Sequence, residues 1–298
     1  MKLREIIYSG VLALGIATGV FSQDSIENKL TYMKDIPCAG RVEKHGPKEA
    51  KKTLVHVRQI HKTNSTQEGK LREKAAKHEG LTKLVEDSLQ AANATATVCQ
   101  MDIYEILDYL SQHGLQNVYQ EGLMDSDDNS EALKRTLEAR EKCLTAKARI
   151  ELYAKNKERF RQVLSVEDFD KLERNYKIMQ ESLLKAEGEL YLRGASEILA
   201  AERKIRLLPA EDKRIHDLAS EVLKGEEGDK ERAEKYSNAR EDVVLKKFST
   251  SPERLAGVVY GSGHDFRDNI DKWNQENPLN QISLVEITPK YIAEKEKK

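Results

Sequence analysis

Short apolar runs alternate along the chain with longer amphipathic segments. The apolar runs are rich in β-branched residues and end at polar residues, glycine or proline, which is typical of buried strands. We predict five strands, at residues 53–61, 115–122, 204–212, 254–264 and 282–288. The strongest helix between them has an apolar stripe that includes Met101, Ile103 and Leu107, and it ends at Gly114. This alternation predicts an α/β fold with a mostly parallel sheet and helices on both faces.

A different pattern occupies residues 130–201. Six apolar residues there are spaced by steps of three and four, which is a heptad seam: Leu172, Tyr176, Met179, Leu183, Ala186 and Leu190. Leu133, Leu137 and Leu144 fit a similar seam, and Ser165 with Asp168 predicts a helix start between the two segments. We therefore expect a long antiparallel helical hairpin, of coiled-coil type, inserted between strands. Its apolar residues are used by the seam, so it is a scaffold or a lid rather than a site.

The first 22 residues have the layout of a secretory signal peptide. A basic start precedes an apolar run, and small residues stand before a cleavage point at residue 23. A retained membrane anchor is the alternative, although the apolar run is somewhat short to span a bilayer. We expect an exported protein, periplasmic, extracellular or associated with the cell envelope. It consists of a polar lead-in at residues 23–50 and a single α/β domain at 51–298.

Charge and cysteine content narrow the class of protein. Charged residues make up 34% of the chain, but 50 Lys and Arg against 51 Asp and Glu leave a net charge of −1. No basic field indicates a nucleic-acid partner, and such dense, balanced charge is typical of long solvated helices. Cys38, Cys99 and Cys143 match neither a metal motif nor a dense disulfide framework. The sequence is compatible both with one disulfide bridge among these cysteines and with reduced thiols that pack on helix faces.

Ionisable side chains stand at the ends of four predicted strands. His61 ends the first, Glu121 the second, Glu211 lies at the end of the third, and His264 follows the fourth. In a parallel sheet these ends share one edge, which is where ligands bind in open α/β folds. The strand before His264 ends in Gly-Ser-Gly, and both glycines allow a ligand or backbone to approach closely. We predict a site here that is neither a P-loop, a G-x-S-x-G elbow nor an H-E-x-x-H helix.

The order of five short motifs resembles a known superfamily. "RQIH", "VYQEG", "LLPAED", "NARED" and "VVYGSGH" are similar to the Tiki/TraB superfamily, which also includes erythromycin esterases and haem-binding uptake proteins. The resemblance implies a site made of His61, Glu121, Arg240 and His264, with Gly261 in the last motif. The first motif has Arg58 where the family has glycine, which adds an arginine near the site. Ligand-binding residues would then be Arg58, Glu211, Gly261 and Gly263.

The resemblance implies hydrolysis of an ester or a peptide bond, in a small-molecule or peptide substrate. In a metal-free scheme His61 takes a proton from water, Glu121 holds the imidazole, and His264 or Arg240 stabilises the oxyanion. In a metal scheme His61, Glu121 and His264 bind a divalent ion that activates the water. A haem- or iron-binding protein is the non-enzymatic alternative, with the two histidines as ligands. An envelope module with an inactive site is a third. The sequence alone does not choose among them.

Overall fold

The computed structural model describes residues 35–61, 65–78, 80–224 and 230–297. The predicted signal peptide and the first part of the predicted lead-in lie outside the described residues. Asp35–Lys298 is one compact unit. Within the described ranges, no helix combines the length and the apolar character that a bilayer span requires.

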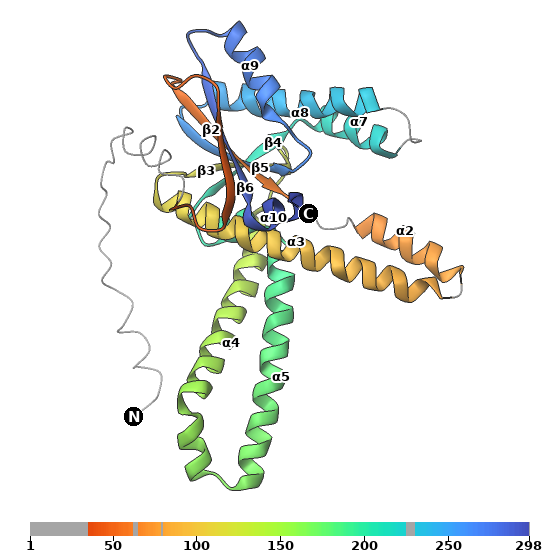
Figure 1. The fold of residues 1–298 in the computed structure, drawn as a ribbon, viewed down its shortest axis with the longest axis vertical. Helices are drawn as coiled ribbons and strands as arrows, with labels where there is room; N and C mark the ends of the chain where they lie inside the picture. Colours follow the sequence, from red (N-terminus) through yellow and green to blue (C-terminus); the bar gives the residue numbers. More distant parts are fainter. Residues whose placement is uncertain (1–34, 62–64, 79, 225–229, 298) are drawn as a thin grey trace. The chain divides into compact units, whose positions relative to one another are not determined.

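Six strands in the described part of the chain form one sheet (Figure 1). They are β1 (Ala39–His45), β2 (Lys52–Gln59), β3 (Asn117–Met124), β4 (Arg206–Glu211), β5 (Leu255–Gly261) and β6 (Ile282–Pro289). Their order across the sheet is β1-β6-β2-β5-β3-β4. All neighbours are parallel except β1, which runs antiparallel to β6. The predicted α/β fold with a mostly parallel sheet is confirmed.

Helices cover both faces of the sheet, because successive strand residues point to opposite sides. On one face Leu54 and Tyr260 share a buried core with Phe248 of α8 and Phe266 of α9. On the other face, where Val55 points, α3 packs on β2 and β6. The described helices are α2 (Ser65–Ala76), α3 (Leu81–Gln112), α4 (Ser130–Val163), α5 (Val166–Tyr191), α6 (Ala195–Ala201), α7 (Lys213–Lys224), α8 (Lys230–Thr250), α9 (Phe266–Glu276) and α10 (Lys290–Glu296).

Strand β1 lies within the predicted polar lead-in, where the sequence analysis assigned no strand. Its sequence, AGRVEKH, is mostly charged and exposed, which suits the edge of a sheet but has no apolar alternation. Pairing with β6 makes it a strand, from Ala39 opposite Pro289 to His45 opposite Leu284. A Cβ atom at Gly40 would lie 2.5 Å from Cβ of Ala293, so glycine lets α10 pack against this strand.

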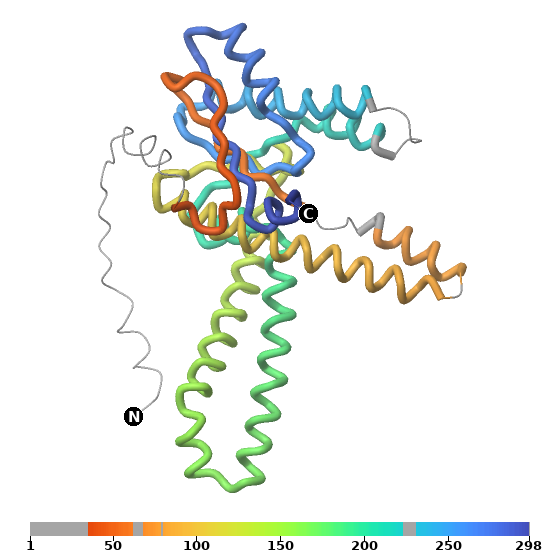
Figure 2. Tube along the Cα trace, viewed as in Figure 1, coloured from red at the N-terminus to blue at the C-terminus, as the bar shows by residue number. Residues whose placement is uncertain are grey.

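The predicted helical hairpin is confirmed as α4 and α5, which pack against each other (Figure 2). Ser165 caps α5 as expected, since its hydroxyl accepts a hydrogen bond from the Asp168 N–H at 3.1 Å. The predicted seam on α4 is wrong at Leu144, which is 49% exposed, whereas Leu133 and Leu137 are partly buried. The buried residues of α4 are Thr136, Cys143 and Tyr153, and the Tyr153 ring lies 4.3 Å from that of Tyr176 on α5.

Helix α3 contributes most of the core on its face of the sheet. Ile103, Ile106 and Leu107 are completely buried, whereas Met101 of the predicted stripe is 45% exposed. The apolar stripe is therefore narrower than predicted, and Met101 lies outside it.

We expect Leu107→Ala to lower the free energy of unfolding by about 2–5 kcal/mol, because it removes buried methyl groups and leaves a cavity. Urea denaturation followed by circular dichroism measures this loss. Met101→Ala is the matched control on the same helix, with an expected change within about 0.5 kcal/mol. Equal losses in the two variants would contradict the packing of α3.

Candidate functional site

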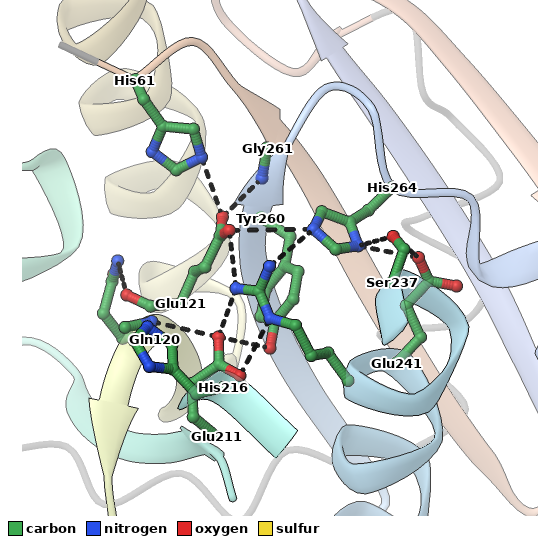
Figure 3. A network of polar contacts seen from close by, with 12 residues as sticks. His61, Gln120, Glu121, Glu211, His216, Ser237, Glu241, Tyr260, Gly261 and His264 are labelled. Carbon is green, nitrogen blue, oxygen red and sulfur yellow. Dashed lines mark hydrogen bonds and ion pairs between the residues drawn. The ribbon is translucent and has the colours of Figure 1, made fainter. Parts of the chain in front are cut away.

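The polar residues predicted at the strand ends come together at one edge of the sheet (Figure 3). Four adjacent strands, in the order β2-β5-β3-β4, supply them. His61 follows β2, His264 follows β5, and Glu121 lies in β3. Arg240 reaches the same point from α8. The structure thus brings together all four residues that the family resemblance singled out.

Glu121 is the residue on which both histidines converge. Its Oε2 atom lies 3.0 Å from His61 Nε2 and accepts the backbone N–H of Gly261 at 2.7 Å. Its Oε1 atom accepts Arg240 Nη2 at 2.9 Å and lies 3.7 Å from His264 Nε2. Each oxygen therefore faces one histidine and at least one further donor.

Glu121 does not end its strand, contrary to the prediction. Strand β3 continues to Met124, and its pairing with β4 is irregular between Gln120 and Met124. The irregularity interrupts the regular ladder at Glu121, which frees this side chain to turn toward the neighbouring strand ends.

Arg240 neutralises two buried carboxylates. Besides Glu121, it binds Glu211 through Nε at 3.1 Å and Nη2 at 2.5 Å. Glu211 is completely buried and also accepts the Tyr260 hydroxyl at 3.1 Å and the Gly122 N–H at 3.3 Å. Burial works against the charge of Arg240, but its bonds to Glu211 raise the pKa of the guanidinium above its ordinary value. Burial, with the charge of Glu211, raises the pKa of Tyr260, so the hydroxyl stays a donor.

Both ring nitrogens of His264 are engaged. Nδ1 lies 2.7 Å from Glu241 Oε1 and 3.1 Å from the Ser237 hydroxyl, and Nε2 lies 3.4 Å from Arg240 Nη1. A guanidinium can only donate, so Nε2 accepts and the ring proton is assigned to Nδ1, facing Glu241. Glu241 is 1% exposed. His264 is thus held in place by three residues of α8.

His61 has a different environment. Its side chain is 54% exposed, and its only partner among the described residues is Glu121, at Nε2. The hydrogen bond to Glu121 raises the pKa of His61 above its ordinary value, although burial and the charge of Arg240 oppose this. Burial of Glu121 favours its neutral form, but the bond to His61, with the charges of His61, Arg240 and His264, holds its pKa well below the usual range. Glu121 is therefore ionised, and Nδ1 of His61 has no hydrogen-bond partner among the described residues.

Glycine at position 261 makes room for the His61 ring. A Cβ atom there would lie 2.8 Å from His61 Nε2 and 3.7 Å from Glu121 Oε2. A Cβ atom at Gly263 would meet nothing within 4 Å. The close approach predicted for both glycines is therefore present at Gly261 alone, and the group that approaches is the ring of His61.

Arg58 does not join this network. It forms an ion pair with Glu296 at 3.0 Å and donates to the Ser262 carbonyl at 3.0 Å. Arg58 is paired with Tyr260 of β5 and lies on the same face of the sheet, but its guanidinium extends toward Glu296 instead of toward Glu121. Arg58 and Gly263 line a cavity of about 420 Å³ that also borders His264. Its other lining residues are Arg41, Glu43, Ser262, Asp265, Arg267 and Glu286.

The predicted metal ligands do not fit a metal ion. In the described part of the chain, no group of three His, Cys, Asp or Glu side chains has the arrangement of a metal site. The guanidinium of Arg240 binds Glu121 and approaches His264, so a permanent cation already lies between two of the three predicted ligands, His61, Glu121 and His264. Ligation of haem by Nε2 of His264 would also have to displace the Arg240 guanidinium from that nitrogen.

Sequence reasoning missed several residues of the network. Ser237, Glu241 and Tyr260 hold His264 or Glu211 in place. The sequence contains an indication of Glu241, because this residue directly follows Arg240 in the "NARED" motif. Gln59 is a further missed residue, two positions before His61 at the end of β2, and its Nε2 donates to Glu121 Oε2 at 3.3 Å.

Gln59 in turn connects the site to the base of the helical hairpin. Its amide oxygen accepts Gln100 Nε2 at 3.1 Å, and the Gln100 oxygen accepts the N–H of Ala195 at 2.8 Å. A backbone N–H only donates and an ionised carboxylate only accepts, so the two ends of this chain determine both amide orientations. The start of α6, directly after the hairpin, is thereby linked to Glu121.

Comparisons of the chain with protein-family models, with curated proteins and with solved structures give no match. The superfamily resemblance therefore stays a prediction that rests on the motifs.

We expect Arg240→Met to lower the free energy of unfolding by about 3–5 kcal/mol, because Glu121 and Glu211 would be left without their shared cation. Thermal and urea denaturation at neutral pH measure the loss. Part of it should be recovered at low pH, where the two carboxylates become protonated. Arg267→Met is the matched control, since the one ion pair of this exposed arginine among the described residues is with exposed Asp265. A stable Arg240→Met variant would contradict the network.

Proposed function

We propose that this protein is a hydrolase that cleaves an ester or a peptide bond with a water molecule activated by His61. The observation that carries the proposal is the pair formed by a half-exposed histidine and a buried carboxylate. His61 Nε2 lies 3.0 Å from Glu121 Oε2, and the second carboxylate oxygen is held by Arg240 at 2.9 Å. A histidine oriented in this way, with its other nitrogen open, is the usual arrangement of a general base.

The proposed reaction uses each ring nitrogen of His61 for a different purpose. Nε2–H donates to Glu121, so Nδ1 is unprotonated and takes a proton from water as the water attacks the carbonyl carbon. Glu121 then stabilises the imidazolium that forms, and it stays ionised because Arg240 is next to it. The proton on Nδ1 passes to the leaving alcohol or amine, which restores the neutral ring.

Arg240 is the better candidate for oxyanion stabilisation. His264 Nε2 accepts a hydrogen bond from Arg240 Nη1, so it has no proton to offer a substrate oxygen. Arg240 always carries a positive charge and reaches the same strand ends. His264 is then a positioning residue, which holds Nη1 of Arg240 through its own contact with Glu241.

The cavity next to His264 is the proposed place for the non-reacting part of the substrate. Three arginines and three carboxylates line it: Arg41, Arg58, Arg267, Glu43, Asp265 and Glu286. Charges of both signs in equal number suit a polar substrate rather than an apolar one. Arg58 and Gly263 therefore keep their proposed ligand-binding role, in this cavity. Export through residues 1–22 belongs to the same proposal.

Haem or iron binding has less support than hydrolysis. His264 is locked at both nitrogens, and the described cavity beside it is lined by charged residues. A haem-binding protein would need an apolar pocket for the porphyrin. Absence of a Soret band after haem addition to the purified protein would agree with the hydrolase proposal, and a stable Soret band would contradict it.

We expect His61→Gln to lower the rate of any ester or peptide cleavage found in a substrate screen by about 10²–10⁴-fold, because the general base is lost. Thermal stability should change little, since the ring is half exposed. His45→Gln is the matched control, because His45 forms a similar pair with Asp271 at 2.7 Å outside the site. Equal activity of His61→Gln and the wild-type protein would show that His61 is not the base.

The pH profile gives a second test of the same proposal. The base must be unprotonated, so activity should fall as the pH drops through the raised pKa of His61, at a pH above the ordinary histidine value of about 6.5. In Glu121→Gln the anionic partner is gone, and the midpoint should move down toward about 6.5. Rate measurements against pH and NMR titration of the His61 ring both report this midpoint. A midpoint that does not move in Glu121→Gln would show that Glu121 does not raise the pKa of His61.

A further inference from the structure

Helix α4 has two apolar faces, and α5 covers only one of them. Cys143 and Tyr153 lie on the inner face, where the helix packs on α5. Leu144 and Leu152 are 49% and 61% exposed, although both are apolar. In a helix with 3.6 residues per turn, these two leucines point away from the inner face. These two leucines therefore do not contribute to the packing of α4 on α5.

The exposed leucines belong to a regular row along α4. Glu141, Leu144, Ala148, Leu152 and Lys155 are all exposed and follow one another at steps of 3, 4, 4 and 3 residues. Such steps keep residues on one side of a helix. We call these five residues the outer face of α4. It has an apolar centre and one charge at each end.

The two charges of the outer face form no ion pair with another described residue. Within the described residues, neither Glu141 nor Lys155 takes part in an ion pair, although several neighbouring charges of the hairpin do, such as Lys157 with Glu173 at 3.0 Å. Two exposed leucines on one side of a helix, with only an alanine between them in the row, form a small apolar patch, whereas exposed apolar residues are generally scattered singly.

The spacing of the outer face is symmetric about its central residue, Ala148, and only the sign of the terminal charge differs between the two ends. Around Ala148, the leucines lie four residues away on either side and the charges seven residues away. If a second copy packs antiparallel with Ala148 against Ala148, each Leu144 meets Leu152 of the other copy. Each Glu141 then meets Lys155 of the other copy. A parallel pair would instead bring like charges together, which is unfavourable.

We infer that the outer face of α4 binds a second copy of this chain, in an antiparallel pair with two-fold symmetry. An interface of this type is self-complementary, because the same residues occur on both sides with their roles exchanged. Ala148 at the centre lets the two helices approach closely. The surface is small compared with those of permanent dimers, so the association is weak and depends on concentration. The inference is independent of the proposed hydrolase activity.

Sedimentation velocity over a concentration series of the purified full chain tests the dimer. We expect the mean mass to rise toward twice that of the monomer as concentration increases. Leu144→Glu should abolish this rise, because it places a charge in the apolar centre. Ile178→Glu is the matched control, since Ile178 is 60% exposed on α5 but lies outside the outer face, and it should dimerise like the wild type.

A charge exchange tests the antiparallel arrangement. Glu141→Lys alone should weaken the dimer at least tenfold, because two lysines then oppose each other at both ends. Lys155→Glu alone should weaken it similarly, through opposed glutamates. The variant with both substitutions restores opposite charges at each end and should dimerise like the wild type. A chain that stays monomeric at every concentration, or a dimer unaffected by Leu144→Glu, overturns the inference. So does a double variant no stronger than the single ones.

Discussion

The ion pair of Arg240 with two buried carboxylates is the interaction on which the strand-end site depends. Glu211 is completely buried and Glu121 nearly so, and two anions so close together would not both stay ionised without a cation. Arg240 supplies that cation from α8 and satisfies both with one planar group. Since Glu121 in turn holds His61 and the Gly261 N–H, the same ion pair connects α8 with the ends of β2, β3, β4 and β5.

This arrangement gives the two histidines different properties although they converge on one carboxylate. His264 is enclosed between Arg240 and buried Glu241, so both of its nitrogens are occupied. His61 has one nitrogen on Glu121, and its other nitrogen has no partner in the described part of the chain. A histidine that accepts a proton from water needs a ring nitrogen without a protein partner. A histidine that positions another side chain needs hydrogen-bond partners at its ring nitrogens. The division of roles under the proposed hydrolase activity follows from burial rather than from residue type.

Much of the site could be predicted, because parallel strands deliver their carboxyl ends to one edge. His61, Glu121, Glu211 and His264 needed only approximate strand boundaries to be placed together. Arg58 could not be placed in this way, because its partner Glu296 comes from a helix near the C-terminus that strand boundaries do not position. Ser237 and Glu241 come from a helix whose orientation toward the sheet depends on packing.

The heptad pattern of α4 shows a similar limit. Spacing by three and four residues predicts a helix with an apolar row, but it does not say which row packs inside the hairpin. The inner row contains Cys143 and Tyr153, and Tyr153 packs on Tyr176 of α5. Leu144, which fits the repeat equally well, lies outside.

By itself the sequence determined the fold class, the helical hairpin and the residues at the strand ends, since these follow from local hydrophobic periodicity and from the geometry of parallel sheets. Tertiary structure alone decided that the charged segment Ala39–His45 is a strand, because its hydrogen-bonding partner β6 lies more than two hundred residues away in the chain. It also decided that Arg240 lies where a metal ion was expected. Both depend on contacts between distant segments, which no local pattern contains.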